Sequence, residues 1–178
     1  MKISITYGFF ITLASSLLSL GFFFTGYHDE VAKLETAQNI GMGLGVAIAI
    51  VCMLMGMREK RELTPADGKW GYGPALGTGV LIGLFGAIFS SIYTYCYFTF
   101  INPNMGELIF QMQVLKMEAK GMTDTQIAQA EPIIRKMMSP VLLTVVSTFT
   151  IFIMNVVLAL ITAIFAKNRP TVEAEPTA

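Results

Sequence analysis

The stretch "PALGTGVLIGLFGAIFSSIYTYCYFTFI" (residues 74–101) contains no charged side chain. The hydrocarbon core of a bilayer is spanned by roughly 20 helical residues, so this run predicts a transmembrane α-helix with length to spare. Its apolar and polar residues do not alternate, which argues against a transmembrane β-strand. Four of its glycines are spaced much like those of a dinucleotide-binding turn: Gly77, Gly79, Gly83 and Gly86. That turn requires a preceding strand, whereas a charged, aromatic loop, "ADGKWGYG" (66–73), precedes it here, so we reject a phosphate site.

Three further runs lack charge and are long enough to cross a bilayer: residues 3–24, 40–57 and 141–166. The composition agrees, because 54% of the residues are hydrophobic and only 13% are charged. We therefore expect an all-α polytopic integral membrane protein, in which residues 1–166 form a four-helix transmembrane domain. The expected spans are about 3–26, 37–57, 74–102 and 140–166. The first run lacks a small-residue cleavage pattern, so we expect a retained helix and not a secretory signal.

The lysines and arginines predict the orientation of these spans, because cytoplasmic loops carry an excess of both. With both termini in the cytoplasm, seven basic residues lie on the cytoplasmic side: Lys2, Arg58, Lys60, Arg61, Lys69, Lys167 and Arg169. Five lie on the opposite side: Lys33, Lys116, Lys120, Arg135 and Lys136. We therefore expect cytoplasmic termini. The polar, proline-containing segment 167–178 is predicted to be a disordered cytoplasmic tail.

Small residues predict where the helices pack. Gly41 and Gly45 are four residues apart in the second span, as are Gly79 and Gly83 in the third, and each pair leaves a smooth strip on one helix face. Asn155, the most polar residue near the middle of the fourth span, is expected to form an interhelical hydrogen bond. These seams can join helices within one chain or between chains, and the sequence leaves both open.

The segment 103–139 is too long for a simple connection and predicts an extracytoplasmic amphipathic helical hairpin. Gly121 is expected to end its first helix, Thr123 and Gln126 to form a capping box for its second, and Pro132 to kink or restart that second helix. Its apolar faces can rest on lipid headgroups or on the bundle, or can bind a partner protein or a second copy. The candidate partner-binding residues on these faces are Leu108, Met112, Leu115, Ile127, Ile134 and Met137.

The residues that carry chemistry in enzymes and transporters are scarce. None of the four spans contains an ionisable Asp, Glu, His, Lys or Arg, which argues against a proton- or ion-coupled pump. His28, the only histidine, is expected to be a solvated helix end and not a metal ligand or a catalytic base. The 12 methionines form no tight repeat that would indicate copper. We expect no enzyme activity and no catalytic, cofactor or metal site, and the net charge of zero gives no reason to expect nucleic acid.

The end of the third span is rich in aromatic residues. Tyr93, Tyr95 and Tyr97 are two residues apart, so they are distributed around the helix and predict a belt at the membrane interface. The alternative is a hydroxyl-lined path through the membrane with Ser90, Ser91 and Thr94.

Three segments carry a resemblance to a known family: "GYGPALGTGVLIGLFGAIFSSIYTYCYFTFINP" (71–103), "GMTDTQIAQA" (121–130) and "MMSP" (137–140). Together they resemble the domain-of-unknown-function 4199 (DUF4199) family, small four-span membrane proteins found mainly in Bacteroidota. The similarity extends from the first span to about Ala166. It implies a location in the bacterial inner (cytoplasmic) membrane, and it brings no activity or catalytic residues.

Two functional hypotheses follow. In the first, the protein is a non-enzymatic accessory or structural subunit, or an assembly factor, of a membrane protein complex, because its distinctive features are packing surfaces. In the second, it is a small homo-oligomeric channel or carrier for neutral or apolar cargo. The expected partners are membrane lipids together with another membrane protein or a second copy.

Overall fold

The computed structural model describes residues 1–65 and 68–168. In chain order the elements are α1 (Lys2–Phe24), α2 (Val31–Glu62), α3 (Tyr72–Cys96), the π-helical turn η1 (Tyr97–Ile101), α4 (Met105–Ala119), α5 (Asp124–Met137) and α6 (Pro140–Ala166). Four helical segments are long and apolar enough to cross a membrane: α1, α2, α3 together with η1, and α6. The expected all-helical, four-span architecture is confirmed.

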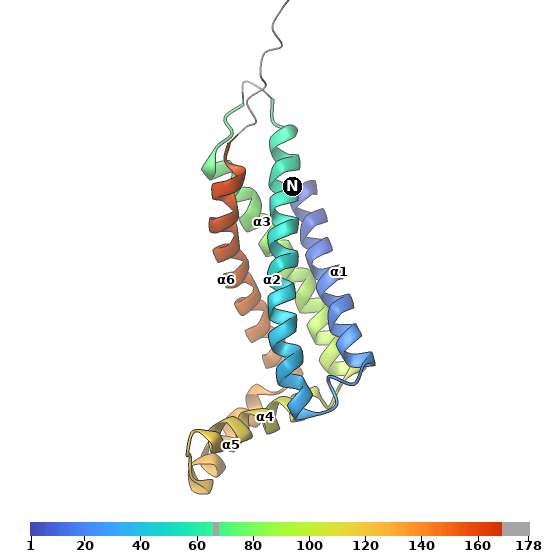
Figure 1. Cartoon of the computed structure of the whole chain (residues 1–178), viewed down its shortest axis with the longest axis vertical. Helices are drawn as coiled ribbons and strands as arrows, with labels where there is room; N and C mark the ends of the chain where they lie inside the picture. The colour runs from blue at the N-terminus through green and yellow to red at the C-terminus, as the bar shows by residue number, and fades with distance from the viewer. Residues whose placement is uncertain (66–67, 169–178) are drawn as a thin grey trace, which may run out of the picture.

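The helices form an elongated antiparallel bundle with one folded appendage (Figure 1). The N-terminus and the end of α6 lie at one end of the bundle, which we call the termini end. The hairpin α4–α5 lies at the other, which we call the hairpin end. Helix α2 continues beyond the expected span 37–57 in both directions, because its added turns carry exposed polar side chains, such as Lys33 and Glu62, that can lie in water outside the membrane. Most of the predicted disordered tail, residues 169–178, lies outside the described residues.

Helix α3 is the centre of the bundle and packs most extensively on α6 and α1. Glycines allow α3 to pack closely against both α1 and α6. A methyl group added at Gly83 would lie 2.7 Å from the Cβ of Asn155 on α6, and one added at Gly8 would lie 2.7 Å from the backbone nitrogen of Gly86. Such distances leave no space for a side chain at either glycine, so α3 lies close to both neighbouring helices.

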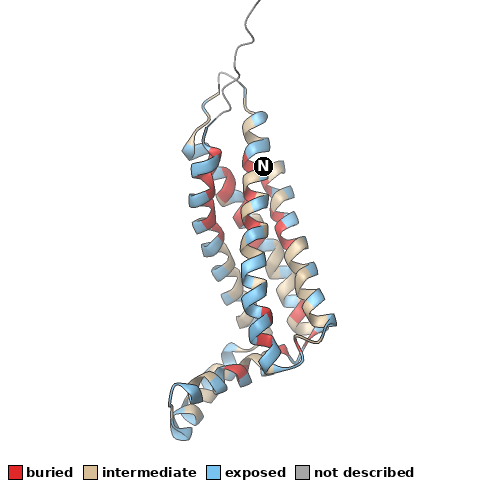
Figure 2. Cartoon of the chain, in the orientation of Figure 1, coloured by how far each residue is buried: buried red, intermediate tan, exposed pale blue. Residues whose placement is uncertain are grey.

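The main hydrophobic core fills the termini end, as the buried residues of Figure 2 show. Its fully buried members include Met53 and Met57 from α2, Ile82 from α3, and Ala159 and Ala163 from α6. Methionine fills irregular gaps between helices, and alanine lets them approach. The outward faces carry exposed large apolar residues such as Phe9 and Phe149, as expected of a surface that contacts lipid.

The hairpin follows its local sequence signals. Gly121 has a φ of 79°, and the Met122 N–H donates to the Met117 carbonyl at 3.1 Å, which closes α4 with a Schellman motif. Thr123 and Gln126 form the expected capping box at the start of α5. The prediction that Pro132 restarts the helix is wrong, because α5 runs through it from Asp124 to Met137. Pro132 is exposed, so water can satisfy the carbonyl group that its missing N–H leaves unpaired.

Candidate functional site

The hairpin is anchored to the bundle by a second hydrophobic cluster. Leu34 from α2, Tyr97 from η1, and Met105 and Met112 from α4 are buried together. Leu108 is half-buried against the same cluster. Two of the six candidate partner-binding residues, Leu108 and Met112, therefore contact the protein's own bundle, which was the alternative left open for the hairpin.

Ion pairs hold the hairpin in one orientation. Lys116 of α4 lies 3.2 Å from Glu35 of α2, which ties the hairpin to the bundle. Arg135 of α5 lies 2.7 Å from Glu107 of α4 and stands 4.0 Å above the ring of Phe110. Each of these charged side chains is about half exposed, so each pair stabilises only weakly. Together the ion pairs fix the position of the hairpin, because they link α2 to α4 and α4 to α5 at defined points.

The other candidate partner-binding residues remain accessible to different degrees. Leu115 is 53% exposed and Met137 is 47% exposed, whereas Ile127 and Ile134 are half-buried. Ile133, which the sequence reasoning did not select, is 66% exposed. The helical periodicity placed Ile134 on the apolar face and did not predict the exposure of Ile133. Only the packing of α5 on α4 and α6 shows which of the two isoleucines is exposed.

His28 is buried at the hairpin end, and the prediction of a solvated helix end is wrong. Only 7% of its surface is exposed, and its Nδ1 lies 2.5 Å from the hydroxyl of Tyr97. The Asn102 side-chain amide donates to the His28 carbonyl at 3.4 Å. Burial lowers the pKa of His28, and the nearby carboxylate of Asp29 opposes this shift only in part. His28 is therefore a neutral packing residue that joins the α1–α2 connection to η1.

Only part of the predicted aromatic belt lies on the surface of the bundle, because Tyr97 packs against His28. Tyr97 is buried, and the Tyr93 hydroxyl donates to the Ser16 carbonyl of α1 at 3.4 Å, so both tyrosines pack inside the bundle. Tyr95 and Phe100 are exposed, as a belt at the membrane interface requires. Helical spacing accounts for this division, because Tyr93 and Tyr97 are four residues apart and lie on one helix face, whereas Tyr95 lies between them on the opposite side.

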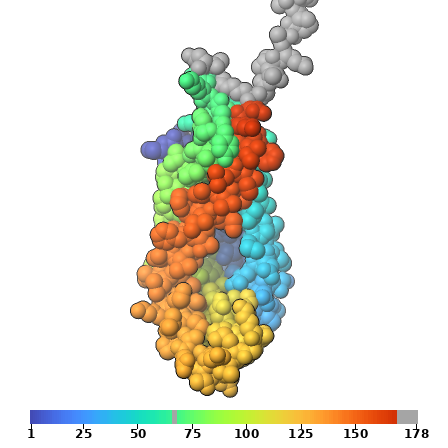
Figure 3. All heavy atoms as spheres, turned by 90° about the vertical axis from the view of Figure 1, so that its left-hand side faces the viewer, coloured from blue at the N-terminus to red at the C-terminus, as the bar shows by residue number. Residues whose placement is uncertain are grey.

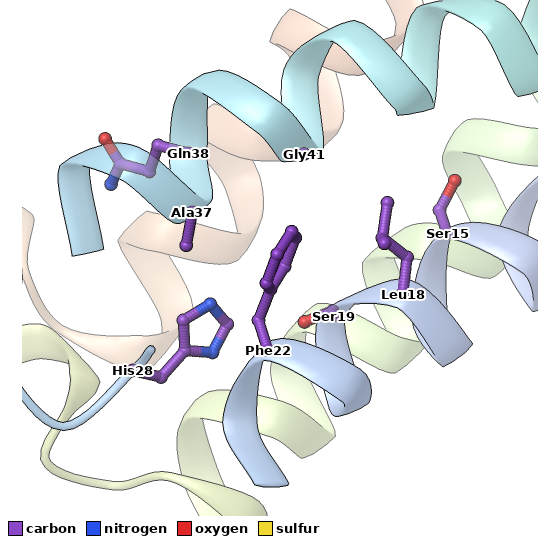
Figure 4. Close-up of a pocket in the computed structure, with 8 residues that line it drawn as sticks. All are labelled: Ser15, Leu18, Ser19, Phe22, His28, Ala37, Gln38 and Gly41. Atoms are coloured by element: carbon purple, nitrogen blue, oxygen red, sulfur yellow. The ribbon is translucent and has the colours of Figure 1, made fainter. Parts of the chain in front are cut away.

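A cavity of about 250 Å³ lies beside His28, between α1 and α2. Figure 4 shows the His28 ring at one end of it, next to Ala37, with the ring of Phe22 reaching into the space between the two helices. The polar side chains of Ser15, Ser19 and Gln38 complete the lining.

A second cavity, of about 340 Å³, separates α2 from α6. Figure 3 shows the mouth of this hollow between the two helices, with α1 visible at its floor. Its lining is mostly apolar and includes Gly41, Gly45 and Ala49 from α2, and Ile151 and Met154 from α6. Ser15 and Gly41 line both cavities, so the two spaces adjoin.

The predicted packing residues fall into two groups. Gly79 and Gly83 face α6 at distances that exclude a side chain, and the Asn155 amide donates to the Gly83 carbonyl at 3.2 Å. In contrast, a methyl group at Gly41 would meet Phe22 at 3.5 Å, an ordinary contact, and one at Gly45 would meet nothing within 4 Å. Gly41 and Gly45 therefore border open space within this chain. Gly8 and Gly56, which the sequence reasoning missed, are in close contact instead, and no spacing motif distinguishes them.

A family model described as "Protein of unknown function (DUF4199)" matches residues 6–168, nearly the whole chain. We found no match among curated proteins and none among solved structures.

Proposed function

The chain belongs to the DUF4199 family, whose description assigns no activity, and we propose that it is a non-enzymatic accessory subunit or assembly factor of a membrane protein complex. The observation that carries this proposal is the hairpin α4–α5. It stands beyond the four membrane-crossing helices, is anchored at defined points, and leaves apolar side chains uncovered.

The anchoring supports a docking role. A flexible segment loses conformational entropy when it binds a partner, and this loss weakens binding. The buried residues Met105 and Met112 and the ion pair between Lys116 and Glu35 already hold α4 against α2. A partner would therefore meet a surface that is ordered before it binds.

The uncovered apolar side chains are Leu115 on α4 and Ile133 and Met137, which are four residues apart on one face of α5, and we propose that these three form the docking surface. Lys120 and Lys136 of the same hairpin are also exposed. An apolar centre with a charged border is typical of protein interfaces, and methionine adapts to differently shaped partners. The competing occupant is the lipid headgroup region, which amphipathic helices also bind.

We further propose that the protein lies in the bacterial inner membrane with both termini in the cytoplasm. The support is that Arg58, Lys60 and Arg61 lie near the termini end of α2, next to the membrane-crossing part of that helix. Reporter fusions to the C-terminus and to the 120–123 turn test this orientation, since only the C-terminal fusion should report from the cytoplasm.

The docking role can be tested with the variant Ile133→Asp, which places a charge at the centre of the docking surface. Its matched control is Ala128→Asp, which adds the same charge at an exposed position on another face of the same helix. Each tagged protein is extracted from its native membrane in mild detergent after light cross-linking, and its assemblies are weighed by native mass spectrometry. Both variants should keep the wild-type helix content, because neither side chain is buried.

We expect a complex of defined stoichiometry with a second protein in the wild type and in Ala128→Asp, and at least a tenfold loss of it in Ile133→Asp. Equal recovery from the two variants would refute the hairpin as the docking surface. Cross-links from the hairpin to lipid alone would assign it to the headgroup region, and the accessory role would then lose its main support.

The carrier for apolar cargo is a second candidate, supported by the cavity between α2 and α6. A homo-oligomer that contains no other protein would favour it, and flux measurements in liposomes would then test transport.

A further inference from the structure

We propose that the adjoining cavities along α2 form a binding site for one acyl chain of a membrane phospholipid, with the chain between α2 and α6 and its polar end near His28. This site is separate from the docking surface on the hairpin, and it does not depend on the proposed accessory role.

The position of the larger cavity points to hydrocarbon. It opens sideways between α2 and α6, two helices that are long and apolar enough to cross a membrane (Figure 3). Exposed apolar residues, Met42 on α2 and Met154 on α6, stand at its mouth. In a bilayer this mouth faces lipid tails. The main core closes the cavity toward the termini end, so a chain can enter from the side but cannot continue across the bundle.

The polar groups in the lining favour an apolar occupant over water. The Thr150 hydroxyl donates to the Val146 carbonyl at 2.9 Å, and the Asn155 amide donates to the Gly83 carbonyl at 3.2 Å. The Ser90 hydroxyl is hydrogen-bonded to Thr12 at 3.1 Å. A buried water needs two to four polar partners, roughly, and three of the four polar side chains that line this cavity already have partners in the protein, the fourth being Ser15. Among the described residues that line this cavity, none is charged.

The shape favours a chain over a compact ligand. The lining residues of α2 run from Ala37 to Ala49, and at 1.5 Å per helical residue this stretch is about 18 Å long. The glycines at 41 and 45 keep this side of α2 flat, and the space in front of Gly45 is unfilled within 4 Å. A groove of this length fits an extended hydrocarbon chain.

The two ends of the groove differ in polarity, as the two ends of an amphiphile do. At the hairpin end, His28, Gln38 and Ser19 line the smaller cavity (Figure 4). At the opposite end the lining is Ala49, Leu158 and Ile11. The polar end of a phospholipid chain, its ester, would thus lie among groups that can donate hydrogen bonds, and the methyl end would lie against the core.

The test uses the full-length protein in phosphatidylcholine vesicles that contain a phosphatidylcholine with a diazirine at the end of one acyl chain. After illumination, peptide mass spectrometry locates the labelled residues. We expect labelling of Ile11 and Ser90, which lie at the floor of the cavity, in addition to exposed residues such as Phe149. Labelling confined to exposed residues would overturn the proposal.

Two leucine substitutions provide a matched pair. Gly45→Leu fills the cavity, whereas Gly43→Leu adds the same side chain at an exposed position of the same helix, and neither position has an atom within 4 Å of the new Cβ. We expect Gly45→Leu to reduce labelling of Ile11 and Ser90 at least fivefold, and Gly43→Leu to leave it unchanged. Equal labelling in both variants would overturn the proposal.

A second pair covers the case that Gly45→Leu fails to fold. Thr150→Phe narrows the cavity from α6, and Val146→Phe enlarges an exposed residue one turn away that does not line it. The same fivefold contrast is expected. In a parallel arm, a free fatty acid with the same diazirine identifies the source of the chain, and labelling of the floor by the fatty acid alone would overturn the assignment to phospholipid.

Discussion

Replacement of Gly83 by alanine tests whether the contact between α3 and α6 holds the bundle together. The new methyl group would lie 2.7 Å from the Cβ of Asn155, an atom next to the backbone that no side-chain rotation can move away. The two helices must therefore separate by some tenths of an ångström. This separation also lengthens the 3.2 Å hydrogen bond from the Asn155 amide to the Gly83 carbonyl.

The magnitude follows from these two effects and from a matched control. Overpacking costs about 1–3 kcal/mol, and an interhelical hydrogen bond in a membrane protein contributes about 0.6 kcal/mol. Alanine also favours a helix over glycine by about 1 kcal/mol, which offsets part of the loss. The control Gly43→Ala has the same propensity gain with open space around the new methyl group. The difference in the free energy of unfolding between the two variants should therefore be about 1.5–3.5 kcal/mol.

The assay is unfolding in mixed micelles with increasing SDS, followed by the fluorescence of Trp70. This single tryptophan reports on the same helix pair, because its indole N–H donates to the Ala166 carbonyl of α6 at 2.9 Å. Helix content from circular dichroism gives an independent transition. If Gly83→Ala is as stable as Gly43→Ala, the close approach of α3 and α6 is not the contact that stabilises the bundle.

Three further predictions concern the hairpin end. Burial lowers the pKa of His28 in the folded protein below its unfolded value of 6.5. As the pH falls, the unfolded chain therefore binds a proton at His28 before the folded protein does. The free energy of unfolding should decrease below about pH 6.5 and level off below the folded-state pKa. The melting temperature, measured between pH 5 and 8, should decrease toward low pH in the wild type and should decrease less in His28→Gln. Parallel curves of melting temperature against pH for the two proteins would contradict this prediction. Tyr97→Phe removes the hydrogen-bond partner of the buried His28 ring and should lower the free energy of unfolding by about 1–3 kcal/mol, measured in the same micelles; no loss would show that this bond contributes nothing. Gly121→Ala places a side chain at a φ of 79°, which costs about 1–2 kcal/mol, so amide hydrogen exchange in the turn 120–124 should accelerate roughly 5- to 30-fold; unchanged exchange would mean that the turn tolerates the strain.

The predictable features of the hairpin are those that depend on neighbours in the chain. The capping box of Thr123 and Gln126 and the left-handed Gly121 involve residues three or four positions apart, so their pattern can be read directly. Of the two effects expected at Pro132, a kink or a restart, the restart was wrong, because α5 continues through an exposed position where water can reach the freed carbonyl. The docking surface was only partly predictable, since periodicity selects Leu115 and Met137 but cannot tell that Met112 is buried against Leu34, a residue far away in the sequence.

The sequence by itself determined that the chain is helical and has four segments able to cross a membrane, because the cost of placing charge and unpaired backbone in hydrocarbon acts on each segment separately. Only the tertiary structure decided which glycines close a contact and which border a cavity. Gly45 and Gly83 occur in similar four-residue spacings, yet one faces open space and the other faces Asn155. It likewise decided that His28 is buried, since Tyr97 reaches it only after α1 and α3 have packed side by side. These outcomes depend on contacts between residues tens of positions apart, and no local pattern encodes them.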